Sequence, residues 1–231
     1  MANLYGPRIV TDGLVLHLDA GNRKSYPLSG NTIYDLSGNG NNGTFGASTA
    51  APTFSGDNGG FLIFDGSNDY INFFAPNLGT IASVEMWVNL GASYSGKMFF
   101  GWAGYDVWCN AGRLGYNTSN SDVYGISSET VSSLGLVNNW RHYIFEMRSD
   151  VSYTNNKIYI NTVSQTLSQQ QGGENSSYRN FNSGNGRISG WRNDYSYSIN
   201  MNCASFKVYN RALTTKEITQ NYTALKGRFG L

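Results

Sequence analysis

Apolar and polar residues alternate along several short stretches of this chain, and a period of two is typical of a β-strand that buries one face. The clearest stretch is 83–90. There Val84, Met86, Val88 and Leu90 alternate with Glu85, Trp87 and Asn89. We therefore expect a central strand with an apolar inner face and a polar outer face.

Two apolar runs in the stretch 61–73 flank the sequence DGSND at 65–69. Gly, Asn, Asp and Ser accept turn conformations or bond their own backbone, so the stretch predicts a strand, a tight loop and a returning strand, that is, a β-hairpin. On the returning strand, Ile71 and Phe73 share the buried face, while Tyr70 and Asn72 share the other.

The same alternation, with Gly or Asn at the ends, predicts further strands. Their ranges are 13–19, 97–102, 105–109, 113–116, 140–148, 157–163, 187–191 and 201–209. In 140–148 neither face is wholly polar, which suggests that one side is covered by loops. The stretch 157–163 is the expected hairpin partner of 140–148. We interpret 22–60 as a long ordered loop with short strands, and 165–185 as an exposed loop.

One helix is expected near the C-terminus. Thr214 and Glu217 have the spacing of a capping box, and Ile218, Tyr222 and Leu225 form an apolar stripe. Gly227 is positioned to end the helix in the left-handed conformation. The stripe should face the sheet.

Composition favours one all-β domain. The chain has 231 residues, 28 of them Gly, with 14% aromatic and 13% charged residues and a net charge of +1. We expect a single domain over 12–231 behind an N-terminal arm at 1–11 that carries apolar side chains and docks on a neighbouring subunit or on its own domain. The near-neutral charge argues against nucleic-acid binding, and no apolar run is long enough to cross a bilayer. Without a signal-peptide pattern, synthesis in a cytoplasm and free, buried thiols at Cys109 and Cys203 are expected.

Several blocks carry a family resemblance. YDLSGNGNNGTF at 34–45, FDGSNDYINF at 64–73 and FKVYNRALTTKEITQNY at 206–222 resemble the laminin-G-like, concanavalin A-like jelly-roll family. LVLHLDAGNRKSYP at 14–27 and NYTALKGRFG at 221–230 are similar to the version found in virion proteins of tailed bacteriophages. The resemblance implies an antiparallel two-sheet β-sandwich of the concanavalin A-like jelly-roll type with a short C-terminal helix.

The resemblance also implies a non-enzymatic structural or adhesive protein of the virion surface, associated with head decoration or fibres. Its partners would be other virion proteins, further copies of itself and a cell-surface glycan. The alternatives are a free-standing carbohydrate-binding lectin domain and a glycan hydrolase. A hydrolase of this family needs paired carboxylates on one strand, and Glu85 and Glu146 each lack a second carboxylate at i±2. His17 and His142, the two histidines, lie in the middle of predicted strands, which favours structural roles.

Calcium is the candidate metal, because laminin-G-like modules often hold it in loops and because Asp and Asn supply hard oxygen ligands. The candidate ligands are Asp19, Asp35, Asn39 and Asn41. The alternative is that the last three make turn hydrogen bonds to their own backbone.

A glycan site would need exposed aromatic rings beside amide and carboxylate groups. Candidates lie in or beside polar segments, namely Tyr105, Trp108, Tyr116, Tyr124, Trp191 and Tyr195, with Tyr178 and Tyr197 as further members. The alternative is that these rings pack within the sandwich.

Overall fold

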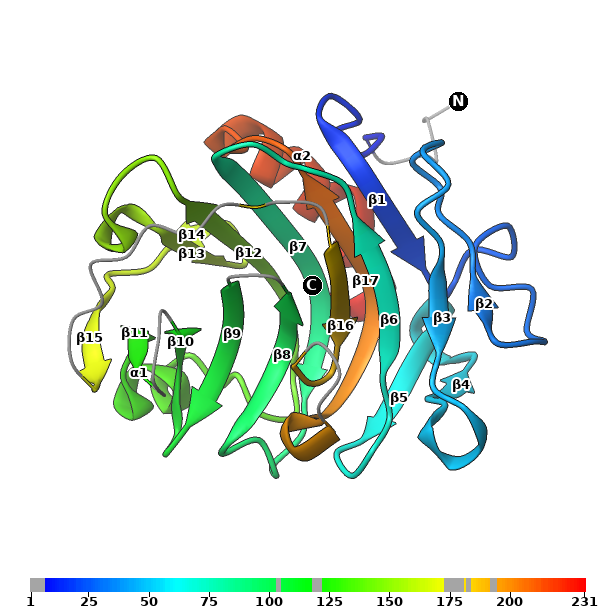
Figure 1. Ribbon diagram of the computed structural model, residues 1–231, viewed down its shortest axis with the longest axis horizontal. Helices are drawn as coiled ribbons and strands as arrows, with labels where there is room; N and C mark the ends of the chain where they lie inside the picture. Colours follow the sequence, from blue (N-terminus) through cyan, green and yellow to red (C-terminus); the bar gives the residue numbers. More distant parts are fainter. Residues whose placement is uncertain (1–6, 103–104, 118–121, 173–180, 182–183, 192–194) are drawn as a thin grey trace.

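The computed structural model describes residues 7–102, 105–117, 122–172, 181, 184–191 and 195–231; the side chains of Tyr105 and Tyr195 are outside the description. Within this part of the chain, two antiparallel sheets face each other in a jelly-roll β-sandwich, as predicted (Figure 1). No helix of the described residues has the length and apolar character that a membrane span requires.

The first sheet has eight strands. In spatial order they are β14 (Val163–Ser164), β13 (Lys157–Ile160), β12 (Trp140–Arg148), β7 (Ile81–Leu90), β17 (Asn200–Tyr209), β5 (Phe61–Asp65) and β4 (Thr53–Ser55), with β1 (Leu14–Asp19) also paired to β17. The predicted pairing of β12 with β13 is confirmed.

The second sheet has nine strands. Their order is β15 (Ser168–Gln171), β11 (Val123–Ile126), β10 (Arg113–Asn117), β9 (Tyr105–Asn110), β8 (Lys97–Trp102), β16 (Gly184–Ile188), β6 (Ile71–Ala75), β3 (Gly43–Phe45) and β2 (Thr32–Ile33). The helices are α1 (Ser128–Ser133), α2 (Thr215–Leu225) and five 3₁₀ turns, η1 (Ser48–Ala50), η2 (Asp57–Gly59), η3 (Tyr153–Asn155), η4 (Tyr195–Tyr197) and η5 (Lys226–Phe229).

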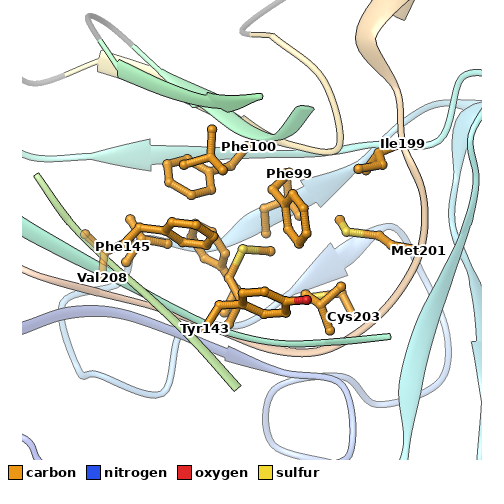
Figure 2. Close-up of a cluster of buried hydrophobic side chains, with 14 of the residues drawn as sticks. Phe99, Phe100, Tyr143, Phe145, Ile199, Met201, Cys203 and Val208 are labelled. Atoms are coloured by element: carbon orange, nitrogen blue, oxygen red, sulfur yellow. The ribbon is translucent and has the colours of Figure 1, made fainter. Parts of the chain in front are cut away.

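The core lies between the sheets because every long strand turns its apolar positions inward. Figure 2 shows part of this core, where aromatic rings of β8 and β12 meet side chains of β17. Phe99 and Phe100 of β8 both reach the core, since a bulge between Met98 and Phe100 breaks the alternation. The free thiols Cys109 and Cys203 are buried, which confirms their prediction. Burial raises the pKa of Cys203 to about 12, so this thiol is chemically inert at neutral pH.

The predicted hairpin at 61–73 is wrong as a pairing. Both strands form and Ile71 and Phe73 are buried as expected, but β5 pairs with β4 and β17, whereas β6 pairs with β3 and β16. The loop 66–70 therefore connects the two sheets. Asp69 accepts a hydrogen bond from the backbone of Asp65 (2.9 Å), which closes this connection locally.

The outer face of the eight-stranded sheet is covered, unlike the prediction for 83–90. Trp87 does lie on the outer face, but its ring stacks between Tyr222 of α2 (5.6 Å between ring centroids) and Phe229 of η5 (4.5 Å) and has no exposed surface. The cover is the C-terminal helix and the turn after it, not loops (Figure 1).

Helix α2 begins as predicted. The Thr214 side chain accepts a hydrogen bond from the Glu217 backbone and the Glu217 carboxylate accepts one from the Thr214 backbone. Its predicted end is wrong, because Lys226 continues in helical geometry into η5 and the left-handed residue is Gly230, with φ of 69°.

Two further expectations change. The stretch 165–185 contains β15, which pairs with β11. Leu14 leaves the face of Leu16 and Leu18 for a cluster with Ile218, because a bulge shifts the register of β1.

Candidate functional site

The outer face of the nine-stranded sheet carries a row of polar positions that crosses seven strands. The pairing register places one residue of each strand opposite the next. In order these are Thr32, Thr44, Asn72, Arg187, Gly101, Asp106 and Asn117. None carries an apolar side chain, which is typical of the outward face of a sheet in a sandwich.

Gly101 in the middle of this row is the place where a loop folds onto the sheet. A Cβ atom at Gly101 would lie 2.9 Å from Cδ1 of Trp191 and 3.1 Å from the carbonyl oxygen of Gly190. Only glycine therefore lets the segment after β16 lie against β8 at this distance. The contact places the Trp191 ring on the outer face, between the positions of Arg187 and Asp106.

The Trp191 ring is part of a small aromatic cluster. Met98, Trp108 and Val123 form a buried floor on the outer face, and Trp191 and Tyr197 pack against it. The rings of Trp191 and Tyr197 are perpendicular, with centroids 6.5 Å apart, and both side chains stay partly exposed. A partly exposed aromatic pair on a fixed floor offers a rigid apolar platform to a ligand.

Amide and charged groups surround the platform. Gln171 of β15 accepts hydrogen bonds through Oε1 from Asn110 (2.8 Å) and from Arg113 (3.2 Å), and Asn117 donates to Asp106 (3.4 Å). We call the partly exposed side chains here the Trp191 surface. Its members are Asn110, Arg113, Asn117, Gln171, Trp191 and Tyr197.

Two glycines, one on β10 and one on β11, lie beside Trp108 in the sheet. Trp108 pairs with Gly115, and Gly115 pairs with Gly125. A Cβ on Gly115 would come within 2.7 Å of Cα of Gly125, so the strands approach more closely than other residues allow.

The structure separates the predicted glycan residues. Tyr116 and Tyr124 point inward: Tyr116 has no exposed surface and its hydroxyl lies 2.7 Å from the carbonyl oxygen of Lys157, while the Tyr124 hydroxyl donates to Thr154 (3.1 Å). The sandwich buries both rings, which is the alternative of aromatic residues that pack within it. Trp108 points outward but is only 7% exposed, so it supports the platform.

Two of the remaining predicted rings lie next to each other. Trp191 is partly exposed on the platform, and Tyr197 from the wider group is its partner. Tyr105 lies in β9 and Tyr195 in η4, with side chains outside the described residues, as is all of Tyr178. Arg113, Asn117 and Gln171 were missed. The alternation of β9 and β10, Asp106-x-Trp108-x-Asn110 and Arg113-x-Gly115-x-Asn117, already carried this signal.

The candidate calcium ligands are engaged in other bonds. The Asp35 carboxylate accepts hydrogen bonds from the backbone of His17 (2.8 Å), Ser37 (2.8 Å) and Asn41 (3.0 Å). The side-chain amides of Asn39 and Asn41 donate to the carbonyl oxygens of Leu14 and Val15. The three side chains therefore make turn hydrogen bonds, which is the alternative to calcium binding, and they also bond to the backbone of β1.

The Asp19 carboxylate bonds to a different part of the chain from the other three candidates. Both of its carboxylate oxygens accept hydrogen bonds from Nη1 of Arg228, each at 3.0 Å. Its Oδ1 also accepts a hydrogen bond from the backbone N–H of Gly21. Among the described residues no group of three or more His, Cys, Asp or Glu side chains is arranged to hold a metal ion. Calcium binding at these four residues stays a prediction from the sequence.

A second cluster of ionisable groups is buried under α2. Glu85 binds Lys207 through Oε1 (2.7 Å) and Asn221 through Oε2 (2.6 Å), and Nε2 of His142 lies 3.2 Å from Oε1. Burial opposes ionisation of Glu85, but the charges of Lys207 and His142 outweigh it and hold the Glu85 pKa well below its usual range. All four side chains are buried, so the cluster fastens α2 to the sheet and offers no access to a substrate.

The chain matches no family model and no curated protein. Solved structures share its fold. The receptor-binding domain of botulinum neurotoxin D aligns with a TM-score of 0.61 and 14% identity over 92% of this chain and 52% of that chain. The binding domain of Paraclostridial Mosquitocidal Protein 1 aligns with a TM-score of 0.60 and 16% identity, over 92% and 52%.

A third similar structure is the ligand-binding domain of botulinum neurotoxin serotype D in complex with N-acetylneuraminic acid, with a TM-score of 0.60 and 14% identity over 92% of this chain and 51% of that one. The chain thus spans about half the length of the structures it matches. At these identities the likeness establishes a common β-sandwich fold.

Proposed function

We propose that this chain is a non-enzymatic carbohydrate-binding domain and that it binds sugar at the Trp191 surface. The observation that carries the proposal is the perpendicular, partly exposed pair Trp191 and Tyr197 beside the amides of Asn110, Asn117 and Gln171. Sugars place their C–H faces on aromatic rings and their hydroxyls on amide and charged groups, so a platform with a polar rim suits them.

The comparisons support a binding role. The similar structures are described as receptor-binding or ligand-binding domains, and one of them holds N-acetylneuraminic acid. Recognition of a cell-surface glycan by this chain is the corresponding proposal.

Burial of the strand carboxylates argues against the hydrolase alternative. Glu85 has no exposed surface under α2, and Glu146, also on the outer face of the eight-stranded sheet, is 2% exposed. A retaining or inverting glycosidase needs two carboxyl groups that reach the scissile bond from an open cleft. Neither residue meets this requirement.

The test is a glycan array with the purified protein, followed by saturation-transfer NMR on the glycans that bind. Trp191→Ala should abolish or strongly weaken binding. Phe74→Ala is the matched control, because Phe74 is an aromatic residue 46% exposed on β6 of the same sheet, outside the Trp191 surface. Both variants should keep the wild-type circular dichroism spectrum.

Absence of any glycan ligand on the array and in NMR would refute the proposal. Equal binding by wild type and Trp191→Ala would place the sugar elsewhere on the molecule. Release of free sugar from a bound polysaccharide would favour the hydrolase.

Attachment to a phage particle is a finer proposal that rests on the sequence resemblance alone. In this version the domain is a structural or adhesive protein of the virion surface, is made in a host cytoplasm, and contacts other virion proteins or further copies of itself. Co-sedimentation with purified particles would support it. Glycan affinity in a protein that never associates with particles would favour the free-standing lectin.

A further inference from the structure

Arg113 is a cation with most of its hydrogen-bonding capacity unused. Its partly exposed side chain makes one described side-chain hydrogen bond, from Nη1 to Oε1 of Gln171 at 3.2 Å, and no ion pair with a described carboxylate. A guanidinium group has five N–H donors. Four of them therefore have no protein acceptor in the described residues.

Its neighbours hold the guanidinium in place without neutralising it. Oε1 of Gln171 also accepts from Nδ2 of Asn110, which stands directly opposite Arg113 in the pairing of β9 and β10. The neutral Oε1 of Gln171 thus holds both the Asn110 amide and the Arg113 guanidinium in place. The carboxylate of Asp106 belongs to the same face, but it is four residues along β9 from Asn110, roughly 13 Å at the usual rise per residue.

Two other carboxylates belong to the chain next to β10: Asp122 directly precedes β11, and Glu129 is in α1. Asp122 accepts a hydrogen bond from Nε2 of Gln169 (3.3 Å), and Glu129 is exposed at the start of α1. The pKa of Glu129 is lowered chiefly by hydrogen bonds around the helix start, and the charge of Arg113 is the least of the causes. Neither group forms an ion pair with Arg113, so no described carboxylate occupies its guanidinium at the end of the Trp191 surface formed by Arg113 and Asn110.

Other groups at this end suit a sugar. Trp108 lies diagonally across from Arg113, and its indole Nε1 is buried without a hydrogen-bond partner. Oδ1 of Asn110 has no donor among the described residues and can accept from a hydroxyl, since the Asn110 side chain uses only its Nδ2. A cation, a free acceptor and an aromatic floor therefore converge here.

We infer that Arg113 binds the carboxylate of an acidic sugar, so that the domain selects carboxylated glycans over their neutral counterparts. This rests on the proposed function and specifies its ligand class. The planar fork of a guanidinium matches a carboxylate in a bidentate pair, and the fixed position set by Gln171 lowers the entropy lost on binding. Asn110 would take a hydroxyl of the same sugar.

The test uses pairs of oligosaccharides that differ only in the acid: a sialylated oligosaccharide against its desialylated parent, and a hexuronate oligomer against the matching hexose oligomer. Affinities are measured by calorimetry for wild type, Arg113→Gln, Arg113→Lys and Arg23→Gln. Arg23 is an exposed arginine of the loop after β1 and serves as the control for charge alone. Sulfated oligosaccharides form a third arm.

Wild type should prefer the acidic member of at least one pair. Arg113→Gln should lose roughly ten- to a hundredfold of affinity for that acidic sugar, the range of charged hydrogen bonds, with little change for the neutral one. Arg113→Lys should recover part of the loss, and Arg23→Gln should bind like wild type.

Neutral sugars that bind as well as acidic ones, with Arg113→Gln unchanged, would overturn this inference and leave the proposed function standing. Preference for sulfated over carboxylated sugars would also overturn it. No binding of any sugar would instead refute the proposed function. Equal melting temperatures of Arg113→Gln and wild type, measured beforehand, ensure that a lost affinity reports the site.

Discussion

The carboxylate of Glu85 and the ammonium group of Lys207 meet at 2.7 Å between neighbouring strands, and neither side chain has any exposed surface. Asn221 of α2 binds the second carboxylate oxygen at 2.6 Å and also accepts the backbone N–H of Val10 at 2.7 Å. The N-terminal segment, the C-terminal helix and two central strands are therefore joined at a single buried carboxylate.

Removing the charge of Glu85 should be costly. Glu85→Gln leaves Lys207 buried without its counter-ion, and we expect a loss of about 3–5 kcal/mol in the free energy of unfolding, measured by urea denaturation. The double variant Glu85→Gln/Lys207→Met should lose less than Glu85→Gln alone, because no unpaired charge remains. Asp150→Asn, which removes the charge of a surface carboxylate 2.7 Å from Arg148, is the control and should have little effect on the free energy of unfolding. A cost for Glu85→Gln no greater than this control would contradict the buried pair.

Trp87 and Val88 test the cover over the outer face. Val88 points into the core and Trp87 into the cluster with Tyr222 and Phe229, and both are fully buried. Trp87→Ala should cost about 3–5 kcal/mol, the usual range for large aromatic truncations, and should match or exceed the cost of Val88→Ala. A near-neutral Trp87→Ala in thermal melting would mean that α2 and η5 leave this face in solution.

The sequence predicted most of the strands because alternation is a local property. It predicted the inward face of 83–90 and the capping box of α2 for the same reason. Pairing is not local, so β5 and β6 were joined as a hairpin although they belong to different sheets. The outer face of β7 looked solvated because Glu85 and Asn89 are polar, whereas Lys207 and Asn221, far along the chain, satisfy Glu85.

The candidate site was predicted only in part because aromatic residues were grouped by composition and not by strand face. Trp108 and Tyr116 lie on adjacent strands, yet one points outward and the other across the core to Lys157. Alternate residues along β9 and β10 point to opposite faces of the sheet, and counting them would have assigned Trp108 to the outer face and Tyr116 to the core. The loop that brings Trp191 over Gly101 depends on tertiary packing, and the sequence pattern holds no signal for it.

His17 should make the protein less stable in mild acid. Burial, followed by the charge of Lys207, lowers the pKa of His17 to about 4, although Asp19, Glu85 and Asp35 act in the opposite direction. Between pH 6.5 and 4 the unfolded chain takes up a proton at this residue that the folded chain does not. Stability therefore falls as the pH drops through this window, by about 3 kcal/mol from His17.

The measurement is urea denaturation at a series of pH values for wild type and His17→Gln. The difference between the two free energies of unfolding should change across pH 6.5 to 4 and level off on both sides. Parallel curves would mean that His17 binds its proton equally well in both states.

The N-terminal arm is the last test. Residues 1–11 were expected to dock either on a neighbour or on their own domain, and for Arg8 and Val10 the structure shows contacts with their own domain. The Val10 N–H binds Asn221, its carbonyl accepts from the Tyr209 hydroxyl (3.1 Å), and its side chain is buried with Leu14 and Ile218. Deletion of residues 1–10 would remove the donor to Asn221 Oδ1 and the acceptor of the Tyr209 O–H, although the Tyr209 oxygen still accepts from Asn221 Nδ2. A lost hydrogen bond of this kind costs about 1–3 kcal/mol where the group stays buried. We therefore expect a clear fall in melting temperature, with a smaller change on deletion of 1–7, which spares the bonds of Arg8 and Val10. An unchanged melting temperature after deletion of 1–10, combined with lost association with other subunits, would show that the arm serves a neighbour instead.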